Sequence, residues 1–108
     1  YRLVEVDEIP RFGDGGSSVI VYILQRFSYR EKEGETQTKF RLGFVINELG
    51  EVVRPHIYGK TEDEYTEAEK RLVGILADMP LWVPGRLGGE TVPVIMLLPV
   101  HIDIREYR

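Results

Sequence analysis

Apolar and polar residues alternate along three segments of the chain, which predicts three β-strands that each bury one face. The first strand alternates from Phe40 to Asn47, the second runs from Glu51 to Tyr58, and the third covers residues 91–104. In the third segment the even-numbered residues are all apolar, so this face is predicted to pack on the core. Between the first two strands, residues 47–50 predict a hairpin turn with Gly50 in the left-handed position.

Two further segments repeat apolar residues at helical spacing. The first helix covers residues 17–28 and is capped by Ser17 or Ser18. The second begins at a capping box, Thr61 to Glu64, and ends before Pro80. Its buried stripe is predicted from Tyr65, Ala68, Leu72, Ile75, Leu76 and Met79, and its wet face from Glu67, Glu69, Lys70, Arg71 and Asp78.

The order helix, hairpin, helix, strand predicts an α+β fold, with a three-stranded antiparallel sheet and two helices on one of its faces. Proline is confined to strand edges, strand starts and bulges because it has no N–H to donate. Pro55 and Pro99 therefore place the second and third strands at the edges and the first in the middle. Residues 1–8 alternate weakly, which predicts a short additional strand or an extended arm. The chain is predicted to be one domain, 1–108, with an arm at 1–16 and a core at 17–108.

The prolines of the last strand also predict which of its backbone groups are free. Backbone N–H groups point to alternate lateral sides of a strand, so Pro93 and Pro99 lack their donors on the same side. That side is predicted to be an open sheet edge with the outward N–H groups of Ile95, Leu97 and His101. An open edge of this kind can pair with another extended chain.

Composition argues against several classes of function. The formal net charge is -4 and basic residues are scattered, which argues against binding of nucleic acid. The chain has no Cys, so it has neither disulfides nor thiolate chemistry, and its two His residues fall on predicted strands. No Ser-His-Asp set is found, and the acidic run at 62–69 lacks the spacing of a calcium loop. We therefore expect no enzyme activity, no cofactor and no metal site.

The only Trp of the chain lies in the linker between the second helix and the last strand. Trp82 is flanked by Pro80 and Pro84 and is followed closely by Gly85. A Trp in this setting more often fills the end of a core than contacts a ligand. We therefore interpret Trp82 as a packing residue.

Three blocks of the sequence together resemble a known family. They are Val6 to Phe12 with Gly15-Gly16, Gly43 to Val52, and Met79 to Val100. The last block is the most specific, because Met-Pro, Trp, Pro-Gly, Val and a closing Leu-Pro follow in the order of the family. Its motif residues are Pro80, Trp82, Pro84, Gly85 and Pro99, and Gly50 belongs to the middle block. In these blocks the chain resembles the carboxy-terminal domain of TonB-type energy transducers, especially the variety found in Bacteroidetes-like bacteria.

The resemblance implies a periplasmic domain that is anchored to the inner membrane through a segment upstream of Tyr1. It implies binding of the TonB box, a short peptide of an outer-membrane transporter, by strand addition to the last strand. The residues implied in this contact are Ile95, Leu97 and His101, with Tyr29 in the loop before the first strand. The domain would transmit force from a proton-driven motor in the inner membrane. After Tyr29 the chain departs from the family pattern, since it continues with Arg30-Glu31-Lys32 and is shorter there.

Two alternatives to energy transduction stay open. The same domain could serve a membrane sensor or an envelope assembly factor, because a fold does not define its partner. Open edges could also pair with each other and make the domain a homodimerisation element. One upstream transmembrane helix with a Pro-rich spacer would indicate a transducer, whereas several spans would indicate a sensor.

Overall fold

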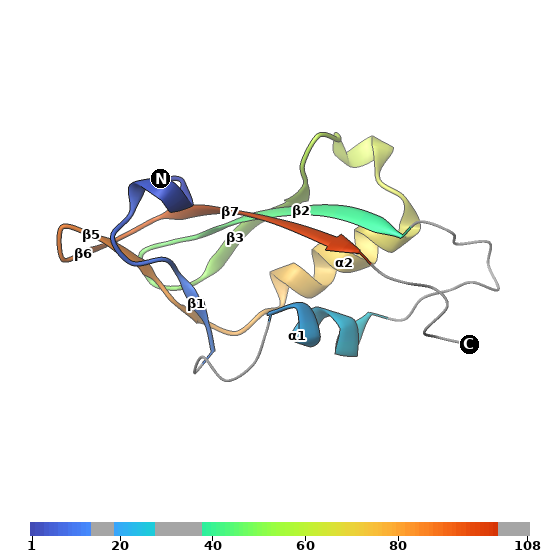
Figure 1. The fold of residues 1–108 in the computed structure, drawn as a ribbon. Helices are drawn as coiled ribbons and strands as arrows, with labels where there is room; N and C mark the ends of the chain where they lie inside the picture. The colour runs from blue at the N-terminus through green and yellow to red at the C-terminus, as the bar shows by residue number, and fades with distance from the viewer. Residues whose placement is uncertain (14–18, 28–37, 102–108) are drawn as a thin grey trace.

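The computed structural model describes residues 1–13, 19–27 and 38–101. They form an α+β fold, as predicted, in which two helices lie on one face of a three-stranded antiparallel sheet (Figure 1). The helices are α1 (Val19–Arg26) and α2 (Glu67–Ala77), and the sheet consists of β2 (Lys39–Ile46), β3 (Val52–Ile57) and β7 (Val94–His101). The predicted cap at Ser17 or Ser18, the loop that begins with Tyr29, and the last strand beyond His101 lie outside the described residues. Neither described helix has the length and apolar character needed to cross a membrane.

The sheet has β2 in the middle and β3 and β7 at its edges, which confirms the order predicted from the prolines. β2 and β7 pair without interruption over all eight residues of each strand. The pairing of β2 with β3 is interrupted by a register shift between Gly43 and Val45. At this shift β3 bulges through Arg54, whose φ is 53°, and Pro55. The edge proline of β3 therefore lies at a bulge, where a missing N–H is tolerated.

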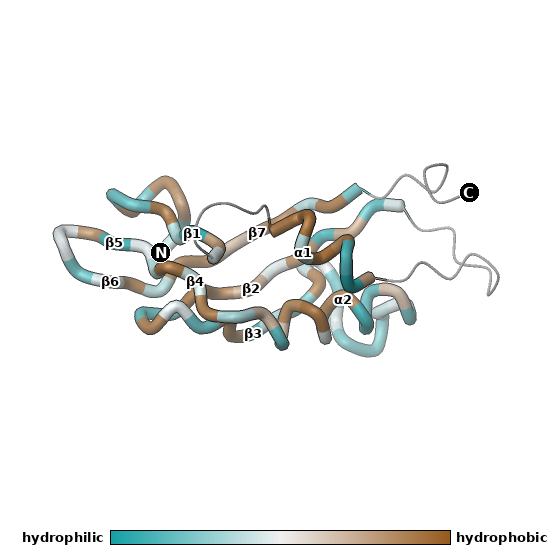
Figure 2. Tube along the Cα trace, turned by 90° about the horizontal axis from the view of Figure 1, so that it is seen from below, coloured by the Kyte–Doolittle hydropathy of each residue, from teal (hydrophilic) through white to brown (hydrophobic). Residues whose placement is uncertain are grey.

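The core lies between the sheet and the helices. Alternate residues of β2 are at most 1% exposed, and the centre of the predicted stripe of α2 packs against them. Most of α1 is hydrophobic and is brown in Figure 2. The even-numbered face of β7 is the core face, as predicted. The buried apolar side chains are Phe40, Leu42, Phe44 and Ile46 of β2, Ile57 of β3, Ala68, Leu72 and Leu76 of α2, Ile23 of α1, Val94 and Val100 of β7, and Phe27 and Trp82.

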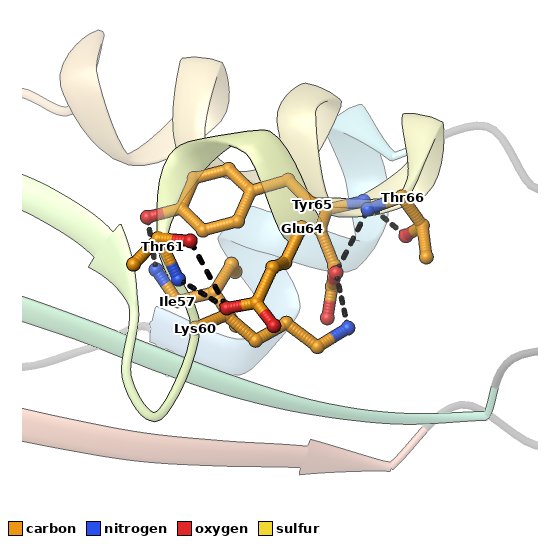
Figure 3. Close-up of polar contacts among 7 residues, drawn as sticks. Ile57, Lys60, Thr61, Glu64, Tyr65 and Thr66 are labelled. Atoms are coloured by element: carbon orange, nitrogen blue, oxygen red, sulfur yellow. Dashed lines mark hydrogen bonds and ion pairs between the residues drawn. The ribbon is translucent and has the colours of Figure 1, made fainter.

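The second helix begins later than the capping box at Thr61 predicted. Thr61 caps a 3-10 turn, η3 (Glu62–Glu64), after which Tyr65 is extended, and α2 begins at a second box capped by Thr66. In that second box, Thr66 N donates to Glu69 Oε1 at 2.9 Å and Glu69 N donates to Thr66 Oγ1 at 3.1 Å (Figure 3). The first box is therefore not the start of α2, because the chain leaves the helical conformation at Tyr65.

Glu69 is buried, although the sequence predicted it on the wet face of α2. The residue is 1% exposed, and its carboxylate accepts a hydrogen bond from Lys60 Nζ at 2.8 Å. Lys60 follows β3 and keeps 35% of its side chain exposed. The capping contact holds Glu69 at the start of α2, and the ion pair with Lys60 compensates for the burial of its charge.

Residues 1–8 were predicted as a short strand or an extended arm, and the structure does not show the strand. Leu3–Glu5 make a 3-10 turn, η1, in which Glu5 Oε1 accepts a hydrogen bond from Arg2 N at 2.7 Å. This carboxylate contact closes the turn locally and takes the segment out of an extended conformation. The chain becomes extended again further on, where β1 (Arg11–Phe12) pairs with β4 (Trp82–Val83).

The predicted last strand is divided at Pro93. Residues before it form β6 (Glu90–Val92), which pairs with β5 (Gly85–Leu87) in a separate hairpin, and only β7 joins the three-stranded sheet. Gly88 and Gly89, with φ of 62° and 82°, make the turn of this hairpin. Alternation alone does not separate the two strands, because it continues through the proline.

Trp82 packs in the core, as predicted, and is 6% exposed. Its ring centroid lies 5.2 Å from that of Phe12 and 5.6 Å from that of Phe44. Trp82 N donates to Gly50 O at 2.8 Å, which ties the linker to the hairpin turn. Gly50 has a φ of 85°, and a Cβ at this position would overlap Trp82 O, so both the backbone conformation and the contact require glycine.

The other motif residues surround this linker. Pro80 follows the end of α2, and Pro84 separates β4 from β5. A Cβ on Gly85 would lie 2.7 Å from Val94 Cγ2 and 3.1 Å from Glu8 O. Glycine at this position therefore allows the N-terminal segment to pass directly over β5.

Candidate peptide-binding edge

The outer edge of β7 is the candidate site, and its register with β2 determines which backbone groups face outward. Pro99 lies opposite Arg41 and has no N–H, so this pair cannot be one that exchanges ladder hydrogen bonds. Alternation along the strand then directs the N–H and C=O groups of Ile95, Leu97 and His101 away from β2. These three residues were predicted from sequence to lie on one edge of the sheet, and the structure brings them together there.

Tyr1 occupies the first position of this edge. Ile95 N donates to Tyr1 O at 2.7 Å, and the amino group of Tyr1 donates to Pro93 O at 3.0 Å. Tyr1 thus bonds to the residue before Val94 and to the residue after it, which is the hydrogen-bond pattern of a parallel strand pair. The contact shows that the N–H of Ile95 points outward and that this edge accepts an added segment.

Two of the three predicted donors are not used in this way. Among residues 1–13, 19–27 and 38–101, the amides of Leu97 and His101 meet no hydrogen-bond acceptor. By the same alternation, the carbonyl oxygens of Leu97 and Pro99 point to the outer side. The segment from Leu97 to His101 is therefore the part of the edge that can pair with a partner without displacing Tyr1.

The two helices cover one face of the sheet (Figure 1). The exposed odd-numbered residues of β7 alternate with its core-facing residues, so their side chains lie on the other face. Ile95 is 44% exposed and Leu97 is 53% exposed. Leu97 lies opposite Gly43, and a Cβ on Gly43 would lie 2.5 Å from Nε2 of His56. The glycine thus makes room for an imidazole ring beside Leu97. Ile95, Leu97 and the imidazole of His56 together form a surface that side chains of an added strand can contact.

Charge is distributed unevenly along the edge. At the His101 end, Lys39 lies opposite His101 and Arg41 lies opposite Pro99, and all four residues are exposed. At the Ile95 end, η1 contacts β7, and the carboxylate of Glu5 pairs with the guanidinium of Arg2, with Oε1 3.5 Å from Nε. The hydrogen bond from Arg2 N lowers the pKa of Glu5, so the carboxylate is ionised at neutral pH. The edge therefore has a basic end and an end beside the Arg2–Glu5 ion pair.

Sequence reasoning missed one part of this site and proposed one residue that lies outside it. It did not predict that Tyr1 contacts Ile95 and Pro93. The weak alternation of residues 1–8 was the only signal in this segment, and alternation does not specify a partner. Tyr29, the fourth residue predicted to contact a peptide, lies outside the described residues.

No family model, curated protein or solved structure matches this chain. Within the described ranges, no three His, Asp or Glu side chains are grouped as metal ligands would be. A functional proposal therefore depends on the geometry of the β7 edge and on the resemblance of the sequence motifs.

Proposed function

We propose that this domain binds an extended peptide by adding it to the sheet as a new strand along β7. In line with the resemblance of its motifs, the partner is the TonB box of an outer-membrane transporter, and the domain is the periplasmic part of a TonB-type energy transducer. The full protein is anchored to the inner membrane and is coupled there to a proton-driven motor. The observation that supports the proposal is the open edge of β7, on which Tyr1 forms one pair of strand-type hydrogen bonds.

The open edge predicts weak to moderate affinity. A peptide beside Leu97 and His101 accepts hydrogen bonds from two amides and donates to outward carbonyls, at a net ~1 kcal/mol for each bond. Covering the exposed side chains of Ile95 and Leu97 adds roughly 25 cal/mol per Å² of buried apolar area. The loss of translational and side-chain freedom opposes both contributions. A contact of this strength can form and release repeatedly, as a coupling between two membranes requires.

A peptide titration tests the proposal. Isotopically labelled domain is titrated with a panel of TonB-box peptides, and backbone amide signals are followed by nuclear magnetic resonance. We expect the amides of Leu97 and His101 to shift and to saturate with one peptide, while the amide of Ile57, on the opposite edge of the sheet, stays in place. If the β7 amides do not move at millimolar concentrations of any peptide, the proposal is wrong.

A backbone-modified peptide provides the matched control. N-methylation at alternate residues removes the N–H donors on the side of the peptide that faces β7 and leaves its side chains unchanged. Strand addition predicts that the methylated peptide loses the shifts at Leu97 and His101. A peptide that binds equally well after methylation would be recognised by its side chains rather than by the edge.

A homodimer is the second candidate, because the same exposed strand can pair with its own copy. Ile95 and Leu97 are large apolar residues that stay exposed on β7. Sedimentation at increasing protein concentration separates this candidate from the first. A monomer at all concentrations excludes pairing between copies, whereas dimerisation that protects the amide of Leu97 supports it.

A further inference from the structure

Residues 1–5 lie beside the start of β7, where Tyr1 is hydrogen-bonded to Pro93 and Ile95. We propose that residues 1–5 act as a cover, an intramolecular competitor that occupies Pro93 and Ile95 and must leave before a partner strand can pair along the whole of β7. This inference rests on the proposed function, because it concerns access to the same edge. It adds a control on binding that operates within the domain.

The competitor uses the groups that an added strand would use. Tyr1 N donates to Pro93 O at 3.0 Å, and Tyr1 O accepts from Ile95 N at 2.7 Å. With Tyr1 in place, a partner strand can pair only from Leu97 onward. When Tyr1 leaves, the partner gains one acceptor and one donor, and its ladder extends toward the start of β7.

Residues 1–5 make few apolar contacts with β7. Each of residues 1–5 is exposed, with 85% exposure for Val4, 50% for Tyr1 and 37% for Leu3. Little apolar area is therefore buried when the segment closes on β7. The hydrogen bonds of Tyr1 and the small turn at η1 hold the segment, so a peptide with comparable hydrogen bonds can displace it.

The chain just after the cover is fixed more firmly. Asp7 N donates to Arg86 O at 2.8 Å, and Gly88 N donates to Asp7 Oδ2 at 2.8 Å. Glu8 forms a bridge with Arg86, in which Arg86 N donates to Glu8 O at 3.0 Å. These contacts keep residues 7 and 8 on the β5–β6 hairpin, so residues 1–5 can leave β7 without breaking the contacts of residues 7 and 8.

Glu5 offers a way to open the cover without touching the edge itself. Glu5 Oε1 accepts from Arg2 N at 2.7 Å, and Glu5 N donates to Arg2 O at 2.9 Å. These two bonds close the turn at η1, which directs the chain so that Tyr1 lies beside β7. Glu5→Ala removes the side-chain acceptor, whereas Glu5→Gln keeps an oxygen at that place. Arg2→Pro removes the donor of the same bond, and the φ of -88° at Arg2 is close to what proline adopts. Val4→Ala is a control at an exposed position with no predicted effect.

The test combines amide exchange with peptide affinity on the full chain, using the TonB-box peptide that shifts Leu97 most. We expect Glu5→Ala and Arg2→Pro each to bind about five-fold more tightly than the original chain, since one hydrogen bond of the cover is lost. We also expect faster amide exchange at Ile95 in both variants. Val4→Ala should match the original chain in both measurements, and Glu5→Gln, which keeps the oxygen but loses the charge, should lie between the original chain and Glu5→Ala.

The outcomes separate this inference from the proposed function. Shifts at Leu97 and His101 with equal affinity in all variants would overturn the inference and leave strand addition intact. Weaker binding in Glu5→Ala and Arg2→Pro would also overturn it, because the segment would then assist the peptide. Absence of shifts in every variant would overturn both the inference and the proposed function.

Discussion

The two edges of the sheet differ in how far they are protected. β3 has six residues, and a bulge at Arg54 and Pro55 interrupts its pairing with β2. β7 has eight residues and pairs with β2 throughout. Proteins commonly protect sheet edges against pairing with other chains, by bulges, prolines and covering groups. The difference supports our proposal that a partner strand adds at β7 rather than at β3.

A tyrosine completes the protection of β3. The outward amide of Ile57 donates to the hydroxyl of Tyr65 at 3.1 Å, so a partner strand would find this donor occupied (Figure 3). Tyr65 is placed there because the chain is extended between η3 and α2. On β7, Tyr1 alone among the described residues covers comparable groups, at the first position of the strand.

The largest expected effect distinguishes inward from outward amides of β7. Leu98 lies opposite Leu42 at a position that exchanges ladder hydrogen bonds, whereas the amide of Leu97 points outward. We expect Leu98→Pro to lower the free energy of unfolding by about 3 kcal/mol or more, and Leu97→Pro by less than about 1 kcal/mol. Urea denaturation of both variants measures the difference. Equal losses would mean that the edge assignment of β7 is incorrect.

The next effect concerns the turn that follows β3. Lys60→Met leaves the buried carboxylate of Glu69 without its lysine partner. We expect a loss of about 2 kcal/mol in the free energy of unfolding, below the range for a fully buried pair because Lys60 is partly exposed. Lys70→Met is the matched control, since Lys70 pairs with Glu67 in solvent, and it should cost less than about 0.5 kcal/mol. A similar loss of unfolding free energy in the two variants would show that burial of the Glu69 carboxylate does not strengthen the effect of losing its lysine partner.

A smaller effect is expected at the protected edge itself. Tyr65→Phe removes the acceptor for Ile57 N and should lower the free energy of unfolding by about 1 kcal/mol. Hydrogen exchange at the amide of Ile57 should become faster, and the two edges of the sheet should become more alike. Tyr1→Phe, at an exposed position, is the control. Unchanged exchange at Ile57 would show that the hydroxyl does not protect this edge.

The smallest effect is the response of the cover to acid. The pKa of Glu5 is lowered, chiefly by the backbone hydrogen bond from Arg2, so the ionised carboxylate stabilises the closed segment above the ordinary glutamate pKa of 4.5. This contribution is lost as the pH falls through the lowered pKa. We expect the amide signal of Ile95 to move in that range and to stay in place in Glu5→Gln. A glutamine variant with the same titration would assign the change to a group other than Glu5.

The sequence predicted the sheet well because alternation is a local property. The buried face of β2 follows from the apolar residues at even positions between Phe40 and Ile46. Its central place follows from Pro55 and Pro99, each of which excludes its own strand from the middle. These inferences required no knowledge of distant contacts.

Features that depend on distant contacts could not be predicted in this way. Glu69 resembles a solvent-facing residue of α2, and its burial depends on Lys60, which reaches it from the turn after β3. The contact between Tyr1 and Ile95 joins the two ends of the described chain, and no local pattern specifies such a pair. The open edge was predicted, whereas its partial cover was found only in the structure.

Peptide binding by Leu97→Pro tests the central claim most directly. The variant removes one outward amide from β7, and Leu97→Val serves as the control that keeps this amide while changing the side chain. If partners add as a strand on β7, Leu97→Pro will bind a TonB-box peptide about ten-fold or more weakly than Leu97→Val. Equal affinities in the two folded variants would contradict strand addition at this edge.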